Sequence, residues 1–136
     1  MVRIFWALCG LGFATIASAQ PDEKSHFLAN NMSHEHTNCS VYFGLVSACA
    51  GKRDAAFKEQ YETIQKEAMK RAFEYSQVAK ILPQTVLART EIAIEEMKKS
   101  IADDCSNIAI LTRQYATSCK LLMENPEQYV TRFLSK

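Results

Sequence analysis

The chain has 136 residues, of which 48% are hydrophobic and 23% are charged, and its formal net charge is +1 at pH 7. This length fits one domain with a modest core, and the interspersed charges of both signs offer no basic surface for nucleic acid or an anionic membrane. The chain contains four glycines, too few for a glycine-rich phosphate-binding loop.

The N-terminal segment has the pattern of a secretory signal peptide. Arg3 precedes an apolar run over residues 4–16, and the Ala-Ser-Ala sequence at 17–19 is the small-x-small pattern that signal peptidase reads. The run is too short to span the roughly 30 Å of bilayer hydrocarbon, and no later segment is long and apolar enough. We therefore expect cleavage of residues 1–19 as a signal peptide and an extracytoplasmic product, either periplasmic or secreted, without a membrane span.

Cleavage changes both the charge and the cysteine count. Loss of Arg3 brings the formal net charge from +1 to zero. Four of the five cysteines remain, namely Cys39, Cys49, Cys105 and Cys119. An even number of cysteines in an oxidising compartment, without any CxxC spacing, predicts two disulfides and not a metal site.

Residues 20–37 are polar and lack periodicity, which predicts a flexible arm. The three histidines of the chain, His26, His34 and His36, all lie in this segment. His34 and His36 are candidate ligands for weak binding of Cu²⁺, Ni²⁺ or Zn²⁺, because imidazole suits these ions. The alternative is a solvated tail without a ligand.

Two N-glycosylation sequons begin at Asn31 and Asn38. They matter only in a eukaryotic host, and a signal peptide occurs in many kinds of host. Glycosylation at these two residues is therefore left open.

Residues 38–136 are predicted to form an all-α domain, because no sustained alternation of apolar and polar residues predicts strands. The first long stripe alternates spacings of four and three: Phe57, Tyr61, Ile64, Ala68, Arg71, Tyr75, Val78, Leu82. Pro83 then ends the helix. A second stripe repeats every seven residues: Leu87, Ile94, Ile101, Ile108, Tyr115, Leu122. Two such runs joined by a short turn predict a small disulfide-stapled bundle built on a long antiparallel helical hairpin, packed as a coiled coil.

A short helix is predicted at the C-terminus. Asn125 is a good N-cap, Pro126 suits the first helical position, and Gln128 completes a capping box. Tyr129, Val130 and Phe133 would give this helix an apolar face.

The disulfides are expected to join different elements. Within one helix, Cys39 and Cys49 would be about 15 Å apart and Cys105 and Cys119 about 21 Å, whereas the Cα atoms of a disulfide lie within about 7 Å. If the chain reverses at 51–54 and the second stripe is one straight helix, Cys39 is level with Cys105 and Cys49 is close to Cys119. We favour this pairing over the crossed alternative of Cys39 with Cys119 and Cys49 with Cys105.

The sequence does not predict an enzyme or a bound cofactor. No histidine lies beyond residue 36, which excludes a Ser-His-Asp or Cys-His system within the bundle. The adjacent acidic pairs at 95–96 and 103–104 point about 100° apart on a helix, so their carboxylates do not share a proton.

Two kinds of binding function are open instead. The first is a protein-interaction module, such as an inhibitor, an adaptor or a chaperone-like protein, because Met69 and Phe73 lie beside the stripe of a helix whose other faces are charged. The second is a carrier that binds a small apolar ligand between its helices. The aromatic residues expected to line such a cavity are Phe57, Tyr61, Phe73, Tyr75 and Tyr115. Metal binding through the His34–His36 arm is a third alternative, and the oligomeric state is left open.

Overall fold

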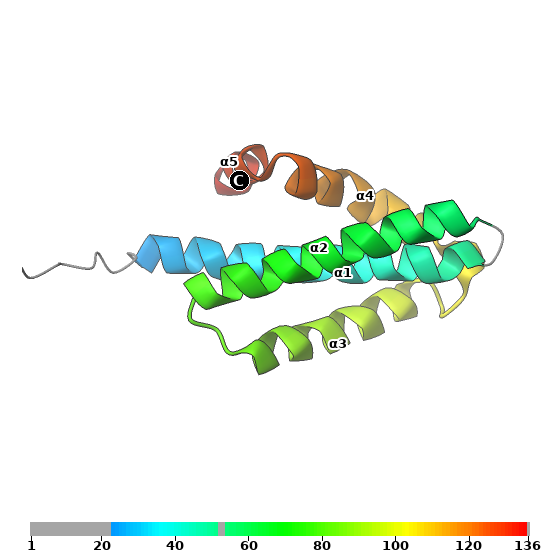
Figure 1. Cartoon of the computed structure of the whole chain (residues 1–136), viewed down its shortest axis with the longest axis horizontal. Coiled ribbons are helices and arrows are strands. Elements are labelled where there is room, and N and C mark those ends of the chain that lie inside the picture. The colour runs from blue at the N-terminus through cyan, green and yellow to red at the C-terminus, as the bar shows by residue number, and fades with distance from the viewer. Residues whose placement is uncertain (1–22, 52–53, 136) are drawn as a thin grey trace, which may run out of the picture.

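The computed structural model describes residues 23–51 and 54–135, and its regular structure is entirely helical (Figure 1). The elements in order are α1 (Glu23–Ala50), α2 (Ala55–Val78), α3 (Pro83–Ser100), the short 3₁₀ helix η2 (Cys105–Asn107), α4 (Ala109–Glu124) and α5 (Pro126–Leu134). The predicted all-α, disulfide-stapled bundle is confirmed. The predicted signal peptide, residues 1–19, lies outside the described residues.

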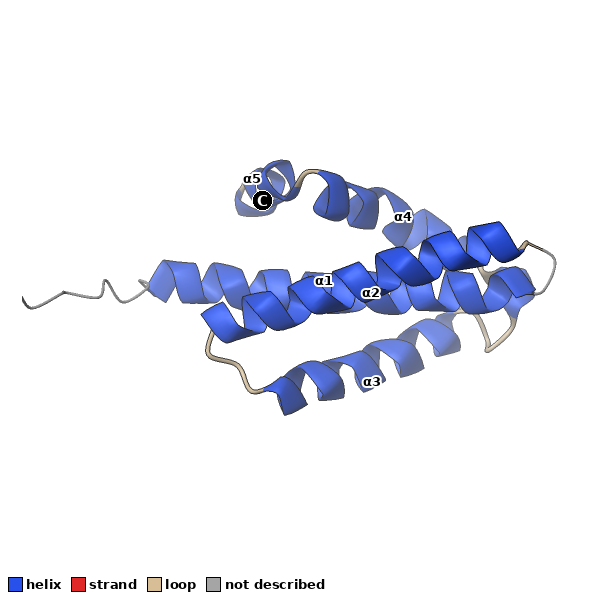
Figure 2. Ribbon diagram, in the orientation of Figure 1, coloured by secondary structure: helices blue, strands red, loops and turns tan. Residues whose placement is uncertain are grey.

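The architecture is centred on a hairpin of α1 and α2, which run side by side in opposite directions (Figure 1). The chain reverses between Ala50 and Ala55, as predicted for 51–54, and the Asp54 carboxylate caps α2 by accepting a hydrogen bond from the amide of Phe57 at 2.9 Å. Figure 2 shows α3 along one side of this pair and α4 with α5 along the other. The hairpin therefore has two flanks, each covered by later helices.

The predicted flexible arm is wrong for residues 23–37, which form the first half of α1. Ser33, His36 and Thr37 are fully buried there. The segment lacks an apolar stripe because its contact with α2 uses small and polar side chains, so its polarity resembled that of a disordered tail. Tertiary packing, and not an amphipathic pattern, holds this part of the helix.

Three α1 serines, seven residues apart, each donate a hydrogen bond to a main-chain carbonyl of α2. The pairs are Ser33 to Ala72 at 2.9 Å, Ser40 to Gln65 at 3.1 Å, and Ser47 to Lys58 at 3.3 Å. The acceptors are also seven residues apart, so this serine ladder has a constant register along the antiparallel pair. Short side chains and the fully buried Ala68 and Ala72 let the two backbones approach closely enough for these bonds. Each bond satisfies a buried hydroxyl that would otherwise destabilise the interface.

The bundle is built on a long antiparallel hairpin as predicted, but α1 and α2 form it, and not the two helices on either side of Pro83. The second predicted helix is also interrupted. Pro83 does start a new helix, but α3 ends at Ser100, and Ala102 and Asp103 both adopt left-handed backbone with φ of 53° and 54°. The Asp104 carboxylate then caps η2 by accepting from the amide of Ser106 at 2.8 Å. The heptad stripe continues across this break, because a repeat of apolar residues does not reveal where the backbone turns.

This break also reverses the predicted disulfide pairing. The structure joins Cys39 to Cys119 and Cys49 to Cys105, with Cα–Cα distances of 5.4 and 5.2 Å. The bridges do cross between elements, as predicted. The favoured pairing is wrong because the turn after α3 makes α4 antiparallel to α1, so the cysteines pair in descending order.

The C-terminal helix forms as predicted. The Asn125 side chain accepts from the amide of Gln128 at 3.1 Å, and Pro126 occupies the first turn. The Tyr129 hydroxyl donates to the Glu35 carboxylate of α1 at 2.8 Å, which ties α5 back to the hairpin. Burial and the Glu35 carboxylate raise the pKa of Tyr129, so its phenol stays protonated and keeps donating at neutral pH.

Candidate functional site

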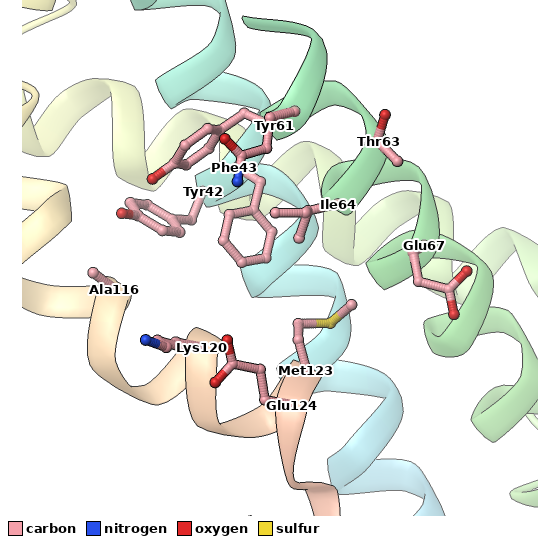
Figure 3. Close-up of a pocket in the computed structure, with 11 residues that line it drawn as sticks. Tyr42, Phe43, Tyr61, Thr63, Ile64, Glu67, Ala116, Lys120, Met123 and Glu124 are labelled. Atoms are coloured by element: carbon pink, nitrogen blue, oxygen red, sulfur yellow. The ribbon is translucent and has the colours of Figure 1, made fainter. Parts of the chain in front are cut away.

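The flank of the hairpin that faces α4 contains a groove of about 540 Å³ where α1, α2 and α4 meet (Figure 3). Most of its lining is apolar or aromatic: Tyr42 and Phe43 from α1, Tyr61 and Ile64 from α2, and Ala116 and Met123 from α4. We call this hollow the α4 groove. Its volume falls within the range of about 300–1,000 Å³ that is usual for small-molecule sites.

A continuous row of five aromatic rings runs along this flank. The contacts, as ring-centroid distances, are Phe57–Tyr61 at 4.5 Å, Tyr61–Phe43 at 5.9 Å, Phe43–Tyr42 at 5.2 Å and Tyr42–Tyr115 at 5.9 Å. The structure thus brings together three of the predicted contact residues. Sequence reasoning missed Tyr42 and Phe43, although an adjacent aromatic pair between two cysteines was a usable signal.

Arg71 crosses from α2 to α4 at one end of the α4 groove. Its Nε donates to the Glu67 carboxylate at 3.0 Å, and its Nη1 donates to the main-chain carbonyl of Met123 at 3.0 Å. A second hollow, of about 460 Å³, lies beyond this guanidinium and shares Met123 and Glu124 with the first. The sequence placed Arg71 in the first stripe, but its tie to α4 depends on tertiary structure.

Tyr75 lies outside the α4 groove, where it stacks on His36 with a centroid distance of 5.4 Å and an interplanar angle of 13°. His36 is 0% exposed, and neither of its ring nitrogens has a hydrogen-bond partner among the described residues. Burial, followed by the positive charge of Arg71, lowers the pKa of His36 to about 4. The imidazole is therefore neutral at pH 7.

The structure does not bring His34 and His36 together. Two residues apart on a helix, their side chains point about 200° apart. His34 is exposed and contacts the Asn38 amide at 3.3 Å, whereas His36 is enclosed between α1 and α2. No group of three or more His, Cys, Asp or Glu side chains suited to a metal ion occurs in residues 23–51 and 54–135.

Met69 lies on the flank of α2 that faces α3, away from the aromatic row, and Phe73, four residues further on, shares that face of the helix. Met69 borders a small hollow of about 170 Å³ together with Thr90 and Ile94 of α3. We call this region, with the outer face of α3, the α3 flank. The six predicted contact residues therefore do not form one site.

The exposed surface of α3 is more apolar than predicted. Leu87 is 52% exposed and Ile94 is 38% exposed, although the heptad stripe placed both in the core. The buried residues are instead Val86, Ala93 and Met97. The buried Val86 and Ala93 each precede the predicted core position by one residue. The reason is that α3 packs chiefly on α1, whereas the predicted hairpin required it to pack on α2.

No protein-family model matches the chain, and no curated protein or solved structure is significantly similar to it. Within the part of the chain that the structure describes, no helix is long and apolar enough to cross a membrane. Function is therefore inferred from the chain's own residues.

Proposed function

We propose that the chain is an extracytoplasmic, non-catalytic protein-interaction module of the inhibitor, adaptor or chaperone-like kind. The observation that carries the proposal is the clustering of exposed apolar side chains. Five of the nine large exposed hydrophobic residues in the described ranges fall within 78–94: Val78, Leu82, Leu87, Ile92 and Ile94. Scattered exposed hydrophobic residues are normal, but Leu87 and Ile94, seven residues apart, share one face of α3, and Ile94 lies beside Met69 of α2. Exposed apolar residues that adjoin in this way are typical of an interaction surface.

The partner expected at the α3 flank is a protein segment with an apolar face of its own. Leu87, Ile94 and Met69 supply the apolar contacts, and Glu91 with Lys98 would form a polar rim of mixed charge. Covering this surface removes apolar area from water, which is the main favourable term in protein association. Glu91 and Lys98 then favour one orientation of the partner more than they add affinity.

A pull-down from the native extracytoplasmic fraction, using the mature oxidised protein, tests the proposal. The L87E/I94E variant should lose the captured partner, with at least a tenfold fall in affinity. The matched control is I110E/L134E, which replaces two exposed hydrophobic residues outside the α3 flank and should bind as the wild type does. Equal binding by both variants would contradict the proposal, provided that circular dichroism shows both to be folded.

The α4 groove supports a second candidate function, the carriage of a small apolar ligand. Its volume and its row of aromatic rings suit a flat or extended apolar molecule. A neutral naphthylamine dye is the probe: it should bind and be displaced by such ligands. Y61S should weaken dye binding about tenfold, whereas F73S, which removes an aromatic ring from the other flank of α2, should not.

Both candidate functions are proposed for an exported protein, and export has a test of its own. Two disulfides favour an oxidising compartment, in agreement with the signal-peptide pattern. Mass spectrometry of the exported protein should find Gln20 at the N-terminus. Recovery of Met1 or Val2 there would contradict cleavage.

A further inference from the structure

His36 occupies a position that suits only one of its protonation states. The ring is enclosed between α1 and α2, stacked on Tyr75, and no described residue accepts or donates a hydrogen bond to it. A neutral imidazole is mildly unfavourable in such a place. An imidazolium carries a charge and two N–H donors, and enclosing it there without partners is far more unfavourable.

The charged groups that act on His36 belong to α2, and further titratable groups lie beyond them on α4, α5 and α1. On α2, the Arg71 guanidinium opposes a second positive charge and the Glu67 carboxylate favours one. Glu67 is already engaged by Arg71 at 3.0 Å, so it offers limited compensation. Beyond these groups, Glu124 of α4 lies at the edge of the second hollow, and Tyr129 of α5 is bonded to Glu35, the neighbour of His36 on α1.

Arg71 connects the surroundings of His36 to α4, and the helices on either side of Arg71 are held in different ways. The serine ladder holds α1 to α2. The end of α4 and α5 are held by the fully buried Leu122, by Tyr129 and Val130, which pack against the core, and by two hydrogen bonds that cross to the hairpin, from Arg71 to the Met123 carbonyl and from Tyr129 to Glu35. The Cys39–Cys119 disulfide anchors α4 only up to residue 119.

We propose that His36 is an acid-sensitive latch: its protonation releases residues 120–134 from the hairpin, while the disulfide retains the rest of α4. Protonated His36 is then a second cation beside Arg71, and the two compete for the Glu67 carboxylate. Because the two cations also repel each other, the Arg71 guanidinium moves away and no longer donates to the Met123 carbonyl. Release opens the α4 groove at its Met123–Glu124 end. The proposal is independent of which ligand or partner the protein binds.

The latch is closed at neutral pH. Burial and the Arg71 charge lower the pKa of His36 to about 4, so the ring takes up a proton only in acid. The released state should therefore become populated as the pH falls from about 6 toward 4.

Hydrogen–deuterium exchange of the oxidised protein, corrected for the intrinsic pH dependence of exchange, tests the latch. Protection of amides in 120–134 should fall at least tenfold between pH 6 and pH 4, while amides in 61–72 keep theirs. H36F fills the same space without a titrating group and should abolish the fall. H34F, the matched control on the exposed face of α1, should behave as the wild type.

Nuclear magnetic resonance titration of the ring protons in the wild type is a second test that does not depend on H36F folding. The midpoint for His36 should coincide with the loss of protection in 120–134. Continued protection through that titration would overturn the latch. Release of H36F at the wild-type midpoint would also overturn it and assign the effect to a group other than His36.

Discussion

Helix α1 buries one side against α2 and another against α4, and the two contacts differ. Against α2 the backbones are close along the serine ladder, where Ser33, Ser40 and Ser47 hydrogen-bond directly to the facing helix, and the His36–Tyr75 and Phe43–Tyr61 ring pairs lie beside it. Against α4 the side chains are large and aromatic, a groove of about 540 Å³ remains, and a disulfide at Cys39 provides the tie.

The difference shows two ways of joining helices in a small domain. Small residues with satisfied hydroxyls determine register and leave little space, so the α1–α2 contact needs no covalent tie. Large aromatic residues bury more area each but leave hollows where their rings do not interlock. On that side a disulfide and a few long hydrogen-bonding side chains replace close packing, and there the protein has room to bind or to move.

Removing the Cys39–Cys119 bridge should have the largest effect on this contrast. C39A/C119A should lower the free energy of unfolding by about 4 kcal/mol, because the bridge closes a loop with a sequence separation of 80. C49A/C105A, with a separation of 56, should lose a similar amount but keep α4 on the hairpin. Urea unfolding measures the loss, and circular dichroism should show the α1–α2 helices retained. Complete loss of helicity in C39A/C119A would mean that the hairpin also depends on this bridge.

The pH dependence of stability should be the next largest effect. Above pH 6.5 neither state protonates His36, but between 6.5 and about 4 the unfolded chain binds a proton that the folded chain does not. Acidification through this window should therefore lower the free energy of unfolding by at most about 3 kcal/mol. The measurement is chemical denaturation at several pH values. H36F isolates the histidine contribution from that of the carboxylates, and an identical pH profile in this variant would exclude the histidine.

Enlarging a side chain in the close α1–α2 contact should destabilise the fold by about 2 kcal/mol. Ala72 is 0% exposed and its carbonyl accepts from Ser33, so A72L forces the backbones apart. The exposed Ala88 of α3 provides the control, since A88L should change the free energy of unfolding by less than about 0.5 kcal/mol. Thermal or urea unfolding distinguishes the two, and a neutral A72L would mean that the contact is looser than described.

Deleting one rung of the serine ladder should have the smallest effect. S33A removes the hydrogen bond to Ala72 without adding bulk and should destabilise by about 1 kcal/mol. S118A, whose hydroxyl donates to Tyr115 within the exposed face of α4, should be nearly neutral. Equal losses in the two variants would show that the ladder contributes no more than an ordinary helical serine.

Several features of the fold were determined by the sequence alone, because short-range chemistry decides them. Pro83 cannot continue the helix before it, and Asn125 with Pro126 starts α5. The cysteine spacings exclude bridges within one helix, so the two disulfides had to cross between elements. Each of these outcomes depends on a few adjacent residues or on distance along one helix.

The remaining features were decided only by the tertiary structure. Residues 23–37 are helical because α2 covers them, and nothing local distinguishes them from a polar tail. The reversal at Ala102 and Asp103 lies within an unbroken heptad stripe, and it alone determines which cysteines pair. His36 likewise lies in a polar stretch of the sequence, and only its contacts with α2 bury it. In each case the deciding contact joins residues far apart in the chain, so its energy does not appear in any local pattern.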